Sequence, residues 1–531
     1  MERRRLQVAI SIVFVVVMVS SFVILRTSGE RSTAGHATGA PTQTPNVLLI
    51  IADDMGIDKI GSYGRDAYQG YPEEAGFLPD TPVLDDLAEV GVRFTDAWAN
   101  PTCSPTRAAL FTGNHGFRTG VGMPIGRANA SVLEYSETTL AETLKLEGYT
   151  SGMFGKWHLG EKDAPEGWWR GDDIQWEAHI GEVVSFEAPP LIHGWDMFSG
   201  TITGAVDSID GDGYYRWTAV ENDRCEGCRE SNRLEVRQVT EYATIQSVSD
   251  ALTWANRQSD AGLPWMVSLT LNAPHSPFEL PPEGCSYRPE GAEAPLKNQP
   301  AIYEEMVECM DIQVGILLEN IDDLENTLVI FVGDNGTAKE VAEGRFDDGR
   351  GKGTVYESGV RVPLIIADGA AILRTADPCA TAHCAVHEPG VVTNAPAHVV
   401  DLFATIAEVV GARSDTSLDG VSLVPLLSDV GGPARASLYA ESFSRDGSGS
   451  FALRRGDWKL TGKVTTTDGE ACLSTYSLFN VAEDRWELED LEGSLAQNAA
   501  AEGAMSALLQ ELDTMAASAE EPPWFAADAC P

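Results

Sequence analysis

The chain has 531 residues, 43% of them hydrophobic, and its 80 Asp and Glu against 37 Lys and Arg give a net charge of −43. This acidity excludes broad electrostatic binding to nucleic acid or to anionic membranes, because both are negatively charged. The length is sufficient for a large domain with its own core and a second, smaller domain.

The first 45 residues differ from the rest in composition. Three arginines, Arg3 to Arg5, precede an uncharged apolar stretch over residues 8–25. As a helix, that stretch would span most of the ~30 Å hydrocarbon core of a membrane. Residues 1–26 therefore fit either a cleaved signal peptide or a retained membrane anchor, and residues 27–45 a linker. We expect an exported protein, periplasmic or extracellular, that meets a membrane only through this segment.

The next element is a continuous apolar run over residues 46–52. The run is short and rich in branched residues, which predicts a buried parallel strand. It ends at Asp53 and Asp54. Two carboxylates after a strand are often only a cap or a turn, so this pair does not define a site without companions.

The run Cys103-Ser104-Pro105-Thr106-Arg107 follows. Pro105 fits the first turn of a helix, where a missing N–H costs nothing. Such a helix places Cys103 at its electropositive start, where an anion is favoured, with Arg107 one turn further on. Because the motif contains no base, we interpret Cys103 as a cysteine that is modified. A structural cysteine at the start of a surface helix is the alternative.

Three later apolar runs also end in polar side chains. They are residues 149–154 before Lys156 and His158, residues 265–271 before His275, and residues 327–332 before Asp334 and Asn335. In open α/β sheets the functional site lies beyond the carboxyl ends of the strands, so these side chains are expected to share one site. Each histidine could alternatively be a structural hydrogen-bonding group.

Asp53, Asp54, Asp334 and Asn335 form a hard, oxygen-rich set of the kind that binds Ca²⁺ or Mg²⁺. Without a cation, three clustered carboxylates would repel one another, and some of their pKa values would rise. The sequence therefore predicts a metal site at this edge of the sheet.

With these companions, the Cys-x-Pro-x-Arg run, followed by Thr112-Gly113, resembles the signature of the sulfatases, in which the cysteine is converted after translation to formylglycine. The resemblance extends from about residue 46 to residue 491. It covers residues 351–363, which resemble the family segment that carries a substrate-binding lysine, here Lys352. Gly333 stands where Ser is usual, and Ser358 stands where Gly is usual.

The resemblance implies a formylglycine derived from Cys103 and a Ca²⁺ ion, in preference to Mg²⁺. The implied metal ligands are Asp53, Asp54, Asp334, Asn335 and the modified residue 103. The implied catalytic residues are Cys103, Arg107, Lys156, His158, His275 and Lys352, of which Lys156, His275 and Lys352 bind substrate. On the same resemblance, the hydrated aldehyde would supply the attacking hydroxyl, with Asp334 as its base. His275 would protonate the leaving oxygen, and His158 would deprotonate the second hydroxyl so that sulfate is expelled.

Eight cysteines remain besides Cys103: Cys225, Cys228, Cys285, Cys309, Cys379, Cys384, Cys472 and Cys530. An even set is compatible with four disulfides in an oxidising compartment, although eight cysteines permit 105 connectivities. Cys225 with Cys228 and Cys379 with Cys384 are close enough in sequence for local pairs. The Cys225/Cys228 spacing also suggests zinc, but no second such pair accompanies it.

The predicted fold is α/β: a large, mostly parallel mixed sheet flanked by helices over residues 46–414, alkaline phosphatase-like by resemblance. Helices are expected at residues 139–147, 301–320 and 398–410. Short strands near residues 437–441, 451–454, 458–460 and 476–479, and a helix at 503–516, predict a small antiparallel subdomain over 415–531.

The expected function is hydrolysis of a sulfate monoester, in a small molecule or a sulfated saccharide, after maturation by a formylglycine-generating enzyme. A phosphonate or phosphodiester hydrolase on the same fold is the first alternative. A non-catalytic carbohydrate-binding relative is the second, although such a protein is expected to lose site residues. The loops at 160–190 and 201–237 carry no legible code for the leaving group.

Overall fold

The computed structural model describes residues 44–531 except residues 68–77, 127–130, 161–168, 171–172, 175, 185–187, 207–212, 224–233, 290, 347–348, 376–383, 388, 414–416, 468–469, 520–523 and 526–531. The predicted signal or anchor segment, nearly all of the linker, and Cys225, Cys228, Cys379 and Cys530 lie outside the described residues. Within the described part, no helix is long and apolar enough to cross a membrane.

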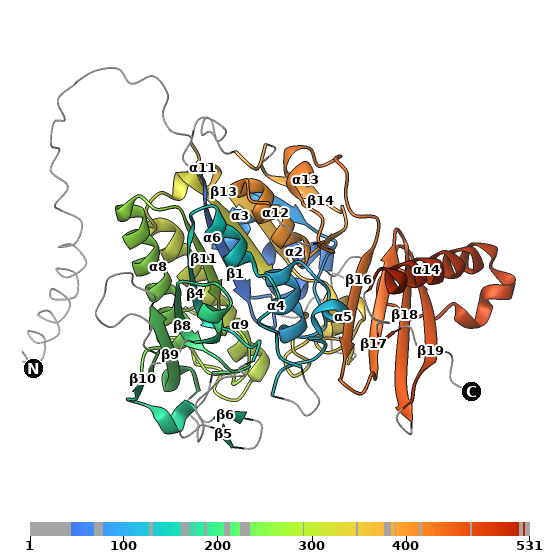
Figure 1. Ribbon diagram of the computed structural model, residues 1–531, viewed down its shortest axis with the longest axis horizontal. Coiled ribbons are helices and arrows are strands. Elements are labelled where there is room, and N and C mark those ends of the chain that lie inside the picture. Colours follow the sequence, from blue (N-terminus) through green and yellow to red (C-terminus); the bar gives the residue numbers. More distant parts are fainter. Residues whose placement is uncertain are drawn as a thin grey trace, which may run out of the picture. The chain divides into compact units, whose positions relative to one another are not determined.

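The central element is an eleven-stranded sheet in the order β14-β2-β13-β12-β1-β11-β4-β8-β9-β10-β7 (Figure 1). Its five middle strands, β12 to β8, run parallel, and antiparallel pairs flank them on both sides. The strands are β14 (Val391–Thr393), β2 (Val92–Phe94), β13 (Leu364–Asp368), β12 (Thr327–Gly333), β1 (Asn46–Ala52), β11 (Trp265–Thr270), β4 (Thr150–Lys156), β8 (Met197–Thr201), β9 (Trp217–Asp223), β10 (Leu234–Val239) and β7 (Val183–Val184).

Helices bury both faces of this sheet, which explains why β1 is buried at every position and apolar at all of them after Asn46. Val47, Leu49 and Ile51 enter a core shared with α4 (Cys103–Thr112), α6 (Leu140–Leu146) and α12 (Asp401–Val410). Leu48 and Ile50 enter the opposite core, shared with α3 (Pro82–Val90), α8 (Ala243–Ala261) and α9 (Gln299–Asn320). The alternation follows from the two-residue period of a strand.

A second sheet of four antiparallel strands, in the order β16-β17-β18-β19, follows near the end of the chain. It consists of β16 (Leu438–Phe443), β17 (Gly449–Arg455), β18 (Trp458–Thr467) and β19 (Glu470–Asn480), drawn in orange and red in Figure 1 beside α14 (Ala499–Ser518). Phe451, Leu453 and Leu460 pack against Leu508 and Leu512 of α14. The predicted mixed sheet and the small C-terminal antiparallel sheet with its helix are both confirmed.

Disulfides are present, as the even cysteine set suggested. Cys285 and Cys309 form one disulfide. Cys384 and Cys472 are each disulfide-bonded as well. Cys103 is a free, buried thiol. Among the described cysteines, Cys103 is thus set apart from the disulfide-bonded ones.

A cluster of buried charges joins the second sheet to the segment between β12 and β13. Lys459 on β18 is fully buried and lies 3.2 Å from Glu357 and 2.8 Å from Glu487. Burial would raise the pKa of Glu357, but Lys459 and Arg454 lower it to about 2. Glu357 follows the segment that carries Lys352, so this cluster anchors that segment against the second sheet.

Replacing Lys459 by Met should lower the free energy of unfolding by about 3–5 kcal/mol, because two buried carboxylates would lose their partner. Urea unfolding measures this change. Arg455→Met is the matched control on the same sheet, because Arg455 forms an exposed pair with Glu511 at 3.3 Å. It should cost less than about 1 kcal/mol. Equal effects of the two substitutions would contradict the role given to the Lys459 cluster.

Candidate active site

Four strand ends and one helix start bring the predicted side chains together. Asp53 and Asp54 follow β1, Asp334 and Asn335 follow β12, and His275 lies beyond β11. Lys156 is the last residue of β4, with His158 just beyond it, and Cys103 is the first residue of α4. Gly155, at φ 111°, allows the close approach of β4 to β11, where a Cβ would meet the Thr270 carbonyl oxygen.

Asp53 lies at the centre of the buried charges. It is fully buried and accepts from Lys156 Nζ at 2.5 Å, and Arg107 lies 3.7 Å away. Burial alone would raise its pKa, but Lys156, His275 and Arg107 lower it well below the usual value. Asp53 is therefore a carboxylate held in place by cations.

Asp54 is held by three residues from two separate segments. Its N–H donates to Asp334 at 3.0 Å, Asn335 donates to its carboxylate at 2.9 Å, and Lys352 Nζ lies 2.6 Å from it. Its φ of 68° is unusual for a residue other than glycine, and His158 has a φ of 55°. Such backbone strain concentrates at functional sites.

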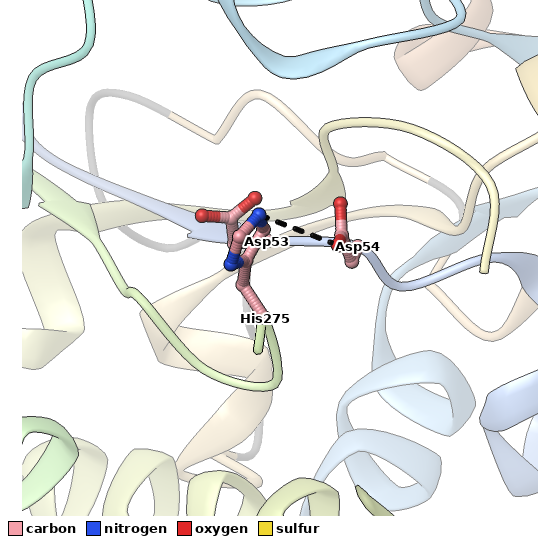
Figure 2. Close-up of side chains that lie close together, drawn as sticks. All are labelled: Asp53, Asp54 and His275. Atoms are coloured by element: carbon pink, nitrogen blue, oxygen red, sulfur yellow. Dashed lines mark ion pairs between the residues drawn. The ribbon is translucent and has the colours of Figure 1, made fainter. Parts of the chain in front are cut away.

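The donor set fits a hard divalent cation. Oδ1 of Asp53 and Oδ1 of Asn335 are buried and have no hydrogen-bond partner among the residues described. Burial and the nearby Asp53 raise the pKa of Asp334 well above its usual value. A cation would relieve the repulsion between these two carboxylates. Asp53, Asp54 and His275 each offer an atom within 4.8 Å of the others (Figure 2). The carboxylate and amide oxygens of Asp53, Asp54, Asp334 and Asn335 are ligands of the kind that Ca²⁺ and Mg²⁺ prefer.

Cys103 faces His158, with 3.2 Å between Sγ and Nδ1. The other ring nitrogen, Nε2, lies 2.9 Å from the carbonyl oxygen of Ile125. A carbonyl only accepts, so Nε2 carries the proton and Nδ1 presents a lone pair to Cys103. Burial, reinforced by Lys156, lowers the pKa of His158 well below its usual value. The imidazole is therefore neutral, and its unprotonated nitrogen points at residue 103.

Arg107 ties this helix to the strand ends. Its guanidinium is fully buried and donates to Asp334 at 3.2 Å and to the Lys156 carbonyl at 2.8 Å. The helix that carries Cys103 is thereby fixed against β4 and β12. This is a positioning contact, and it accounts for Arg in the Cys-x-Pro-x-Arg run.

His275 and Lys352 lie on the more exposed side of the site. Their side chains are 16% and 21% exposed, whereas Asp53 is fully buried. His275 Nε2 lies 3.7 Å from Asp54, an ion pair drawn in Figure 2. Burial would lower the pKa of Lys352, but Asp54 and other nearby anions raise it. A ligand entering the site therefore meets these two groups before the fully buried Lys156.

The structure thus brings eight of the predicted site residues into one network of contacts: Asp53, Asp54, Arg107, Lys156, His275, Asp334, Asn335 and Lys352. Cys103 and His158 form a separate contact, and α4, which carries both Cys103 and Arg107, joins that contact to the network. A purely structural, hydrogen-bonding role does not account for the positions of His158 and His275. His158 faces the Cys103 thiol, and His275 faces the Asp54 carboxylate.

Sequence reasoning missed three residues that support the site. The Ser104 hydroxyl donates to the His158 carbonyl at 2.8 Å, the Tyr303 hydroxyl donates to the Asp54 carbonyl at 2.8 Å, and the Tyr214 hydroxyl lies 2.8 Å from the His275 carbonyl. Ser104 adjoins the motif and could have been found there. A tyrosine far along the chain gives no such signal.

Comparison with known proteins identifies the family to which the chain belongs. The family model described as "Sulfatase" matches residues 45–412. The chain belongs to the sulfatase family. Human arylsulfatase A is 30% identical over 506 residues, covering 90% of this sulfatase and 88% of that protein. The predicted sulfatase resemblance and the assignment as an arylsulfatase-type enzyme are confirmed.

Solved structures show the same fold. Ps i-CgsB, solved in complex with k-i-k-neocarrahexaose, superposes with a TM-score of 0.65 at 24% identity, covering 91% of this sulfatase and 95% of that chain. BT4656, solved with its substrate D-glucosamine-2-N,6-O-disulfate, has a TM-score of 0.63 at 18% identity. The superposition covers 88% of this sulfatase and 98% of that chain. Both neighbours were solved with saccharides.

Loading the site with a divalent cation should stabilise the folded sulfatase. At a free Ca²⁺ or Mg²⁺ concentration of 100 times Kd, the gain is about 2.7 kcal/mol, because the unfolded chain lacks the site. Thermal unfolding after chelation and re-addition measures it. Asn335→Ala should remove most of the gain, whereas the control Asn326→Ala, beside the start of β12, should retain it. A cation-independent unfolding temperature in the unsubstituted protein would contradict the metal site.

Proposed function

We propose that this sulfatase hydrolyses sulfate monoesters with a nucleophile derived from Cys103, releasing sulfate and an alcohol or phenol. The observation that carries the proposal is the position of Cys103. It begins a buried helix, faces the unprotonated nitrogen of His158, and adjoins a cluster of cations. The cluster suits a substrate whose reacting group is an anion.

Cys103 would be converted to formylglycine by a maturation enzyme, and the hydrated aldehyde would supply the attacking hydroxyl. Asp53, Asp54, Asp334 and Asn335 would hold Ca²⁺, with the modified residue as a further ligand. The ion would polarise the sulfuryl group and lower the pKa of oxygens bound to it. Asp334, as a neighbouring carboxylate, is the proposed base for the hydroxyl.

Lys156 and Lys352 are proposed to bind the sulfuryl oxygens. In the structure they pair with Asp53 and Asp54. A cation on those carboxylates would neutralise them and leave the two ammonium groups available to an anionic substrate. Their charges, added to that of Arg107, would stabilise the charge that develops as the ester bond breaks.

The two histidines are assigned opposite tasks. His275, on the exposed side, would protonate the leaving oxygen. His158 would take a proton from residue 103 through Nδ1, the atom that the Ile125 contact leaves unprotonated. This step would restore the aldehyde and expel sulfate.

We further propose that the protein is exported, that it matures beside a formylglycine-generating enzyme, and that it acts on a sulfated saccharide or an aryl sulfate. The disulfides support an oxidising compartment. The two saccharide-bound structural neighbours support a sugar substrate. We also retain the proposal that residues 46–414 form the catalytic domain and residues 415–531 a subdomain.

The sulfate monoester and a phosphodiester of 4-nitrophenol separate the proposal from the phosphonate or phosphodiester alternative. The protein, produced with a formylglycine-generating enzyme, should show a higher kcat/KM for the sulfate, and Cys103→Ala should abolish this turnover. Equal or greater turnover of a phosphodiester would favour the alternative. Tight saccharide binding with no turnover of any ester would favour a carbohydrate-binding relative.

His275→Ala should reduce kcat according to the leaving group. For an alkyl or sugar sulfate, a loss of about 10²–10⁴-fold is expected, because the departing oxygen needs a proton. For 4-nitrophenyl sulfate the loss should be much smaller, because nitrophenolate leaves without protonation. Equal losses on both substrates would remove His275 from this role.

A further inference from the structure

A groove of about 670 Å³ opens between the segment after Lys352 and the second sheet. It is lined on one side by Met123 and residues 353–356, and on the other by residues of β16, β17, β18 and β19. This volume lies within the range of pockets that hold a small organic ligand. None of the proposed catalytic residues lines it, so it is a separate feature.

The strand register explains why this wall of the groove is polar. Ser442 pairs with Ser450, Ser450 with Lys463, and Lys463 with Thr475, so these residues form one row across the four strands. The neighbouring row is Ala440, Ala452, Thr461 and Ser477. Side chains two residues apart share a face, so both rows lie on the face opposite α14.

The same sheet face changes character along its length. At one end Leu438, Ala440 and Ala452 pack against Trp98 and Val355 of the large domain. Further along the strands the side chains become Ser, Thr and Lys, and the packing gives way to the groove. The groove is thus a polar continuation of the interface between the four-stranded sheet and the large domain.

The hydroxyl groups of the groove are available to a ligand. Ser442, Ser450, Thr461, Thr475 and Ser477 donate no side-chain hydrogen bond to any described residue. A hydroxyl that is both donor and acceptor suits another hydroxyl, and a saccharide presents many of them. The hydroxyls of a sugar ring can take the place of water at such groups.

Lys463 adds a positive charge to this wall. It is exposed and has no carboxylate within ion-pair distance among the residues described. Asp446, from the turn between β16 and β17, is held instead by the hydroxyls of Ser444 and Ser448. In a chain of net charge −43, a lysine without an acidic partner favours an anionic ligand at this place.

The groove begins where the candidate active site ends. Gly353 follows Lys352 and donates to the Pro101 carbonyl at 2.7 Å, two residues before Cys103. Met123 lies two residues before Ile125, whose carbonyl fixes the His158 ring. The segments that hold Lys352 and His158 therefore also form the wall of the groove.

We propose that this groove binds a saccharide unit next to the sulfated sugar that reacts, and that Lys463 recognises an acidic group, sulfate or carboxylate, on that unit. The inference rests on the proposed sulfatase function and narrows its substrate class to acidic oligosaccharides. The hydroxyl rows bind the sugar ring, and Lys463 selects for charge.

The test compares a short substrate with a long one. 4-Nitrophenyl sulfate is too small to reach the groove, whereas carrageenan, chondroitin sulfate and heparin oligosaccharides extend beyond the site. On the oligosaccharides that the protein hydrolyses, Lys463→Met should raise KM by about ten-fold through loss of a charge-assisted contact. The kcat, and both constants for 4-nitrophenyl sulfate, should change by less than about two-fold, because bond cleavage does not involve Lys463.

Matched variants separate recognition from structure. Lys463→Arg should restore KM, and Arg455→Met, a lost cation on the opposite face of the same sheet, should leave it unchanged. Thr461→Val with Ser477→Ala should raise KM even when the neighbouring sugar is neutral. Comparing sulfated, carboxylated and neutral neighbouring sugars identifies the group that Lys463 binds.

Two outcomes would overturn the inference while the proposed function stands. One is turnover of 4-nitrophenyl sulfate with neither hydrolysis of, nor inhibition by, any of these oligosaccharides. The other is an unchanged KM for Lys463→Met on every oligosaccharide that is hydrolysed. Absence of sulfate-ester turnover on all substrates would instead overturn the proposed function.

Discussion

The balance of buried charge at the carboxyl end of the large sheet is the constraint on which the site depends. Asp53, Asp54 and Asp334 are buried there beside Arg107, Lys156 and Lys352. Removing one member leaves an unpaired buried charge, which is costly. The opposed charges therefore hold separate strands and a helix in one geometry, and the same charges can stabilise an anionic reaction centre.

The second sheet contributes to the site through the segment between Asp334 and β13. That segment carries Lys352, lines the proposed groove, and contains Glu357, which Lys459 anchors. A sugar bound in the groove would contact the same backbone that positions Lys352. In the proposed reaction, recognition of the substrate and placement of the Lys352 charge would therefore share one structural element.

The sequence predicted the parts of the fold that follow local pattern. Residues 46–52, 265–271 and 327–332 were recognised because strands buried on both faces are mainly apolar, and the polar residue after each marks the sheet edge. The groove could not be predicted in this way. Ser450, Lys463 and Thr475 are ordinary surface residues in sequence, and only strand register aligns them. Tyr214 and Tyr303 were missed because the backbone carbonyls they contact lie on distant segments.

The central claim is that residue 103 acts as an aldehyde within this charged cluster. The most direct measurement is mass spectrometry of the peptide containing residue 103, taken from preparations of graded specific activity towards 4-nitrophenyl sulfate. The account predicts that activity rises in proportion to the fraction in which the thiol has been replaced by an aldehyde. Full activity in a preparation whose Cys103 is an intact thiol would contradict it.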